Sequence, residues 1–200
     1  YVSEEILKIE ERTKKQPEHV LVLNDYDSFN NKGGGGVRTR EIYKEVSTWS
    51  SVVFLCFSDD SKFTIRCENN NITIFSIPKT SSHIEELQTL NSYFHVAVDD
   101  IVAHRQCHLN KIFVSIYNVL KGLSRAILVE HPYIATIPLS FNDRFIYSSQ
   151  NFETQIKRDL LKYHPFYDEL VNEVTKMERD AIENASAIIA VSEQDAYSFV

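Results

Sequence analysis

Short apolar runs alternate with longer segments of helical period along this chain, and that order most constrains its fold. The runs are rich in Val, Ile and Leu, and they lie at 20–24, 52–57, 72–77, 126–130, 144–149 and 187–192. Runs with so few polar residues are typical of strands buried on both faces, as in a parallel sheet. Apolar residues at steps of three and four predict helices in 109–123 and 167–185. The order predicts an α/β fold: a Rossmann-like, doubly wound, mainly parallel sheet with helices on both faces.

Two local patterns refine this prediction. Residues 62–77 have the pattern of a hairpin whose turn is the "ENNN" of 68–71. The helix at 109–123 should present one apolar face made of Leu109, Ile112, Phe113, Ile116, Leu120 and Leu123.

The leading segment sets the expected domain organisation. Residues 1–18 are predicted to form a helix or linker that Pro17 ends, and 19–200 to form one Rossmann-like domain. A hydrophobic content of 43% with 24% charged residues is ordinary for a globular chain of this length. Because the chain starts at Tyr1 and not at Met, we expect it to belong to a longer protein.

Charge and composition argue against several classes of function. The net charge is -7 and no basic block stands out, so nucleic acid is not expected as the main partner. The apolar runs fall well short of the roughly 20 residues of a membrane helix, and from the sequence as given we do not expect a secretory signal peptide. The three cysteines, an odd and sparse number, favour reduced thiols and a cytoplasmic location.

Four of the five glycines in the chain stand together, as Gly33, Gly34, Gly35 and Gly36, between the first strand and a helix expected at 37–49. The spacing fits neither the G-x-G-x-x-G of dinucleotide-binding folds nor the Gly-Lys-Ser/Thr ending of a P-loop. A flexible surface loop is one interpretation. The other is a loop that brings backbone close to a phosphate or a sugar at a helix N-terminus.

Asp25 and Asp27, in "DYD", directly follow the first strand. The pair has the form of the carboxylates with which one class of glycosyltransferases holds a divalent metal on a nucleotide diphosphate. In that class, however, the pair follows a later strand. We therefore favour turn-forming aspartates that end the first strand.

The last third of the chain contains "YSSQN-x-E" at 147–153, then "ME-x-x-AIENA" at 177–185 and "AIIAVSEQDA" at 187–196. Together with "KGGGGVRTRE" at 32–41, this order resembles the N-terminal, acceptor-side domain of a GT-B-fold glycosyltransferase of family four. The resemblance covers 19–200.

The resemblance implies transfer of a sugar from a nucleotide-sugar donor to a glycan or other acceptor, with retention of the anomeric configuration and with no metal or further cofactor. It implies that this half binds mainly the acceptor, and that a C-terminal donor domain, absent from this chain, binds the nucleotide. Peripheral membrane association of the full-length protein is compatible with it. Two alternatives stay open: a GT-B-fold epimerase that acts on the nucleotide-sugar itself, and a non-catalytic binding module of a larger protein.

By the same resemblance, the glycines match a family loop near the diphosphate and the acceptor. Arg38 or Arg40 could bind an anionic acceptor or a phosphate, because guanidinium suits bidentate contacts; the alternative is a solvated helix surface. His131 matches a family histidine that contacts the donor sugar and is the catalytic candidate, and otherwise it would be a loop residue bonded to backbone.

Three further residues complete the expected site. Asn151 and Glu153 follow a strand and could bind sugar hydroxyls, unless Asn151 caps the next helix. Ser192 is expected to bind substrate or to cap a helix in a pair with Asp195. Glu178 lies on an apolar helix stripe, where a buried carboxylate needs a partner, and we expect it to tie neighbouring loops together.

Overall fold

The computed structural model of the protein describes residues 2–15, 19–30, 33–93 and 96–199. It forms two compact units, each described here by itself. The first unit is Tyr1–Lys79 with Asn110–Leu128, and the second is Thr80–Leu109 with Val129–Val200. The helix end expected at Pro17 and the boundary expected at residue 18 lie outside the described residues, and the single domain expected over 19–200 stays a prediction.

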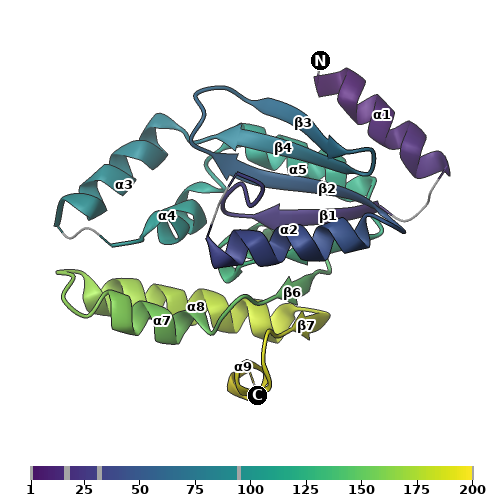
Figure 1. The fold of residues 1–200 in the computed structure, drawn as a ribbon. Helices are drawn as coiled ribbons and strands as arrows, with labels where there is room; N and C mark the ends of the chain where they lie inside the picture. Colours follow the sequence, from purple (N-terminus) through teal and green to yellow (C-terminus); the bar gives the residue numbers. More distant parts are fainter. Residues whose placement is uncertain (1, 16–18, 31–32, 94–95, 200) are drawn as a thin grey trace. The chain divides into compact units, whose positions relative to one another are not determined.

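The first unit is built on a mainly parallel sheet in the order β3-β4-β2-β1-β5 (Figure 1). Its strands are β1 (His19–Asn24), β2 (Ser51–Ser58), β3 (Thr64–Asn69), β4 (Ile72–Pro78) and β5 (Ala126–Val129), the last of which ends at the border of the two units. Strand β2 is parallel to both β1 and β4, whereas β3 is antiparallel to β4. The predicted hairpin is confirmed, and Asn69 closes its turn by accepting hydrogen bonds from the backbone N of Asn71 and Ile72, both at 2.8 Å.

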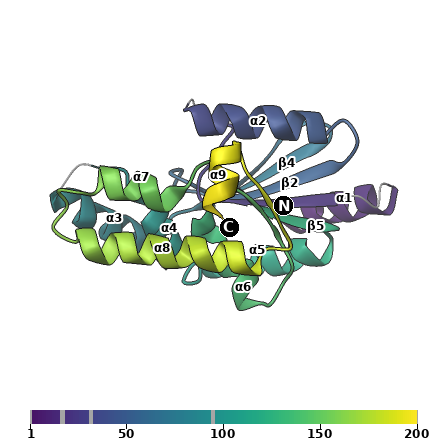
Figure 2. The same cartoon turned by 90° about the horizontal axis from the view of Figure 1, so that it is seen from below.

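Helices cover both faces of this sheet. Helix α2 (Gly34–Val46) lies on one face and α5 (Lys111–Gly122) on the other, and α1 (Val2–Lys15) is the remaining helix of the described part of the unit (Figures 1 and 2). Strand β2 serves both faces because its side chains alternate. Phe54 packs edge to face on Tyr43 of α2, whereas Phe57 contacts Phe113 of α5. The predicted doubly wound α/β fold class is confirmed.

The second unit is mostly helical, with a parallel pair of short strands, β6 (Ile146–Ser148) and β7 (Ala187–Ile189). Its helices are α3 (Ser81–Tyr93), α4 (Asp99–Gln106), the 3-10 helix η1 (Pro132–Ile134), α6 (Thr136–Ser140), α7 (Glu153–Leu160), α8 (Tyr167–Asn184) and α9 (Glu193–Ser198). One apolar core joins α3, α4, η1 and α8 through Leu90, Val98, Ile101, Val102, Tyr133, Leu161, Leu170, Val171, Val174 and Met177. The predicted helix at 167–185 is therefore confirmed as an amphipathic helix with its stripe in the core.

Within the described ranges, no helix combines the length and the apolar character that crossing a bilayer requires.

Candidate functional site

A pocket of about 320 Å³ opens at the carboxyl ends of β1 and β2 in the first unit. Parallel strands end at the same edge of a sheet, and open α/β folds bind ligands at that edge. The lining is largely polar and consists of Asp25, Tyr26, Asp27, Asn30, Phe57, Ser58, Asp59, Asp60 and Lys79. The sequence pointed to the loop after β1, but not to the residues that β2 and β4 bring beside it.

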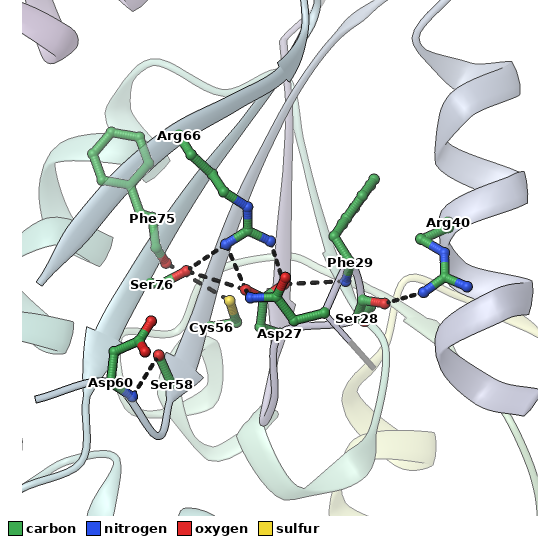
Figure 3. Close-up of polar contacts among 11 residues, drawn as sticks. Asp27, Ser28, Phe29, Arg40, Cys56, Ser58, Asp60, Arg66, Phe75 and Ser76 are labelled. Carbon is green, nitrogen blue, oxygen red and sulfur yellow. Dashed lines mark hydrogen bonds and ion pairs between the residues drawn. The ribbon is translucent and has the colours of Figure 1, made fainter. Parts of the chain in front are cut away.

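Asp27 is held by Arg66, which reaches it from the hairpin strand β3 (Figure 3). The guanidinium is bidentate: Nη1 lies 2.5 Å from Oδ2, and Nη2 lies 2.7 Å from Oδ1. Arg66 Nη1 also donates to Ser76 Oγ of β4 at 3.2 Å. Burial alone would lower the pKa of Arg66, but the hydrogen bonds and the charge of Asp27 raise it above the ordinary value. The pair fixes the loop after β1 to β3 and β4.

Asp27 also builds its own turn, as predicted. Its Oδ1 accepts the backbone N–H of Phe29 at 3.0 Å, and its Oδ2 accepts Asn30 Nδ2 at 2.9 Å. The Asp27 carbonyl accepts the backbone N–H of Asn30 at 3.2 Å. Among the described residues, no group of three or more His, Cys, Asp or Glu side chains is placed to hold a metal ion. The carboxylate of Asp27 thus serves a turn and an ion pair.

Three more aspartates line the pocket. Asp25 is buried at the end of β1, and its backbone N–H donates to Asn24 Oδ1 at 3.0 Å. Asp60 follows β2, where its backbone N–H donates to Ser58 Oγ at 3.0 Å (Figure 3). Asp59 pairs with Lys79 Nζ at 2.6 Å, and the Asp59 side chain is 90% exposed. The described lining therefore contains four aspartates and one lysine.

The four glycines do not form a loop, which corrects the expectation. Gly33 occupies the N-cap position of α2 in an extended conformation with φ -68°, and Gly34, Gly35 and Gly36 form the first helical turn. No described glycine has a positive φ, so backbone strain does not require glycine here. A Cβ added to Gly34 would meet nothing within 4 Å. The four glycines therefore form the start of α2. Their expected contact with a ligand stays a prediction.

The two arginines of α2 are both half-buried. Arg40 Nη1 donates to the backbone carbonyl of Ser28 at 3.0 Å, so it fastens the loop after β1 to the helix (Figure 3). This contact rules out a purely solvated surface for Arg40. The predicted binding of an anion by Arg38 or Arg40 stays a prediction.

His131 stands in the second unit, directly before η1 and two residues after the end of β5. Its ring meets the ring of Tyr133 edge to face, with 6.0 Å between the centroids. The Tyr133 hydroxyl donates to Glu153 Oε2 at 2.9 Å, and Asn151 Nδ2 donates to Glu153 Oε1 at 3.3 Å. His131 and Glu153 thus both contact Tyr133, a tyrosine that the sequence patterns did not single out, and Asn151 is joined to this group through Glu153.

Glu178 sets the start of α7. It is almost fully buried on α8, and its two oxygens accept the backbone N–H groups of Glu153 at 2.7 Å and Thr154 at 2.9 Å. Burial raises the pKa of Glu178, and these hydrogen bonds oppose the shift. The N-cap residue of α7 is Phe152, so the alternative in which Asn151 caps this helix is wrong. The expected structural role of Glu178 follows from its geometry: it caps α7 from a neighbouring helix.

Ser192 caps the short helix α9, as one prediction had it. Its Oγ accepts the backbone N–H of Asp195 at 3.0 Å and donates to Asp195 Oδ2 at 2.7 Å. Both contacts are exposed, and binding of substrate by Ser192 stays a prediction.

No family model matches the sequence, and a search of curated proteins also gives no match. Solved structures do match. A sucrose-phosphate synthase from Thermosynechococcus elongatus is 11% identical, with a TM-score of 0.56, over 90% of this chain and 44% of that chain. An α,α-trehalose-phosphate synthase (UDP-forming) from Burkholderia vietnamiensis is 13% identical, with a TM-score of 0.44, over 91% of this chain and 41% of that chain.

The chain therefore spans less than half the length of the structures it matches. The likeness to the sucrose-phosphate synthase shows the fold. These neighbours are GT-B glycosyltransferases, so the predicted likeness to a GT-B domain is confirmed at the level of the fold.

Proposed function

We propose that this chain is the acceptor-binding domain of a retaining glycosyltransferase, which moves a sugar from a nucleotide-sugar donor to an acceptor hydroxyl. The observation that carries the proposal is the fold shared with sucrose-phosphate synthase over 90% of this chain and 44% of that chain. The nucleotide would be held mainly by a second domain outside this chain.

The pocket of the first unit supports the acceptor role. Its volume of about 320 Å³ is within the usual range for small-molecule sites. Carboxylate, amide and hydroxyl side chains line it, and these groups exchange hydrogen bonds with sugar hydroxyls. It also opens at the edge of the sheet where α/β folds bind ligands.

In the proposed reaction, His131 contacts the donor sugar. Its place at the end of a strand and its ring contact with Tyr133 give it a fixed position. Glu153 is buried and bound to Tyr133 and Asn151, so it acts as support for this group. A fixed polar group beside the anomeric carbon would stabilise the developing oxocarbenium ion without reorganisation.

The experiment incubates the full-length protein with UDP-, GDP- and ADP-sugars, with and without a panel of sugar acceptors, and measures release of nucleoside diphosphate. We expect release that depends on an acceptor, and a product whose anomeric proton shows retention by NMR. His131→Ala should slow turnover roughly 100-fold, the usual cost of removing one group that stabilises charge in the transition state.

His108→Ala is the matched control, since His108 is an exposed histidine of the same unit that bonds Thr136. Failure to release nucleotide from any donor would overturn the proposal. Turnover of the nucleotide-sugar without acceptor would instead identify the epimerase alternative.

A further inference from the structure

A second cavity, of about 350 Å³, lies among helices α7, α8 and α9 of the second unit. Its lining comes from the residue before α7 and from α7 itself, from the C-terminal part of α8, and from the end of α9. The described lining includes neither His131 nor any residue of the first-unit pocket. The volume is within the usual range for small-molecule sites, so this cavity can bind a ligand independently of the proposed function.

Two arginines from different helices line this cavity, Arg158 of α7 and Arg179 of α8. Both are exposed, and within the described residues neither guanidinium forms a hydrogen bond or an ion pair. Asp159 is next to Arg158 in the chain and Glu183 is one helical turn from Arg179, yet neither carboxylate pairs with them there. Two guanidinium groups at one cavity repel each other, and an anion bound by both would relieve that repulsion.

The two glutamates of the lining do not pair with these arginines. Both carboxylate oxygens of Glu178 accept backbone N–H groups, those of Glu153 and Thr154, at the start of α7. The charge of Glu178 is thereby matched by the positive end of that helix. Glu183 is exposed, so water and salt screen its charge. Both arginines are therefore available to an anionic ligand.

The lining also has an apolar part. It consists of Phe152, Ile182 and Phe199, each of which is half-buried. The rings of Phe152 and Phe199 meet edge to face, with 5.9 Å between their centroids. A flat ring packed on these side chains would remove apolar surface from water and add a ring contact, and both effects favour binding.

Two hydroxyl groups of the lining can act only as acceptors. Thr175 Oγ1 donates its hydrogen to the carbonyl of Val171 at 2.7 Å, and Ser198 Oγ donates to the carbonyl of Gln194 at 3.1 Å. A hydroxyl has one hydrogen to donate, so neither group has one left for an anion. The arginines are therefore the side chains of this lining that can hold a negatively charged group.

We infer that this cavity binds a phosphate ester that carries a flat ring. Arg158 and Arg179 hold the phosphate, whose three terminal oxygens can accept hydrogen bonds from two guanidinium groups at once. The ring packs on Phe152 and Phe199. A carboxylate, with two oxygens and a single charge, matches two arginines less well than a phosphate does.

The experiment measures binding to the full-length protein by ligand-observed NMR at millimolar concentration. The probes are phenyl phosphate, which carries both the ring and the phosphate, and inorganic phosphate and phenol, each of which carries one of the two groups. We expect phenyl phosphate to bind at least ~10-fold more tightly than either of the others, because burial of the ring adds to the charged hydrogen bonds.

The double variant Arg158→Gln with Arg179→Gln should weaken binding of phenyl phosphate at least ~10-fold, because it removes the charged donors. The matched control, Arg144→Gln with Lys176→Gln, removes two positive charges at exposed positions of the same unit outside the lining. It should change the affinity by less than about twofold, because exposed distant charges are screened. Phe199→Ala should weaken phenyl phosphate and leave inorganic phosphate unchanged.

Thermal unfolding of each variant checks that the fold is retained, and the two double variants decide the question if Phe199→Ala does not fold. Absence of phenyl phosphate binding, unchanged affinity in the arginine variant, or an equal loss in the control would each overturn the inference. Inorganic phosphate that binds as tightly as phenyl phosphate would overturn the role of the ring. Because the readout is binding and not turnover, failure of the proposed function would leave this test unaffected.

Discussion

Arg66 donates hydrogen bonds to both carboxylate oxygens of Asp27, from Nη1 at 2.5 Å and from Nη2 at 2.7 Å. The two residues are 39 positions apart in the sequence. Asp27 belongs to the loop after β1, and Arg66 to β3 at the far end of the strand order of the first unit. Ser76 of β4 contacts both members of the pair. The ion pair thus anchors the loop that supplies Asp25, Tyr26, Asp27 and Asn30 to the pocket, and Arg40 fastens the same loop to α2.

Replacing Arg66 with alanine should destabilise the protein markedly. Asp27 is 9% exposed, so Arg66→Ala leaves a mostly buried carboxylate without its cation. Loss of one partner from such a pair costs about 3 kcal/mol of unfolding free energy. Urea unfolding at neutral pH measures this change. The control is Lys44→Ala, which breaks an exposed pair with Glu41 and should cost less than about 0.5 kcal/mol. Equal losses in the two variants would contradict a stabilising role for the pair.

His19 should make the protein less stable in mild acid. It is fully buried at the start of β1, and its ring nitrogens have no hydrogen-bond partner within the described residues. Burial lowers the pKa of His19 from 6.5 to about 4. Because the folded pKa is the lower one, the unfolded chain takes up the proton first as the pH falls. Stability is therefore complete above pH 6.5 and decreases as the pH drops toward 4.

Measured as unfolding free energy in urea, this loss should be about 2 kcal/mol between pH 7.5 and 5. His19→Phe keeps a buried ring and removes the titrating group, so this part of the pH dependence should disappear. His104 and His108, whose pKa values burial also lowers, remain in both proteins and cancel in the comparison. Identical pH profiles for the two proteins would show that His19 protonates freely in the folded state.

The strands could be predicted from sequence because burial on both faces leaves a direct signal. Every residue of β2 is buried, and its sequence "SVVFLCFS" is nearly all apolar. The hairpin was also predictable, since Asn-rich turns form from local hydrogen bonds. The buried face of the helix at 111–122 was only partly predicted. Ile112, which was expected on that face, is 48% exposed, whereas Tyr117, which was not, is buried. Apolar character alone could not show which face of that helix packs on the sheet.

The site was harder to predict because its contacts are long-range. No local sequence pattern predicts the contact of Arg66 with Asp27 or that of Tyr133 with Glu153. The partners are 39 and 20 positions apart, and only the fold brings them together. The glycines were wrongly predicted to form a loop, and the reason is local. Glycine is a poor helix former, yet these residues stand in the first turn, where helices tolerate it better than in the interior. The motif order still predicted the GT-B fold, because it follows the order of strands and helices.

Tyr133→Phe should lower both the activity and the stability of the protein. The variant keeps the ring that packs in the second-unit core and beside His131, but it removes the hydrogen bond to Glu153. Loss of that bond should cost about 1–2 kcal/mol of unfolding free energy. If Glu153 and Tyr133 position His131, kcat should fall about tenfold while KM for the acceptor changes little. Tyr163→Phe, at an exposed position, is the control. An unchanged kcat would limit this group to a structural role.

Gly34→Ala separates the two explanations for the glycine run. A methyl group at this position meets nothing within 4 Å, and alanine favours a helix over glycine, so the unfolding free energy should rise by about 0.5 kcal/mol. Gly122→Ala is the matched control, because Gly122 is also helical and its added Cβ also meets nothing within 4 Å.

Thermal unfolding should show a similar gain in both glycine variants. If a ligand approaches the backbone at the start of α2, only Gly34→Ala should raise the KM of the proposed reaction, because its methyl group would occupy the space that the ligand needs. A more stable protein that binds its substrates less well would assign the glycine to ligand contact. Unchanged KM values in both variants would show that Gly34 serves only to begin the helix.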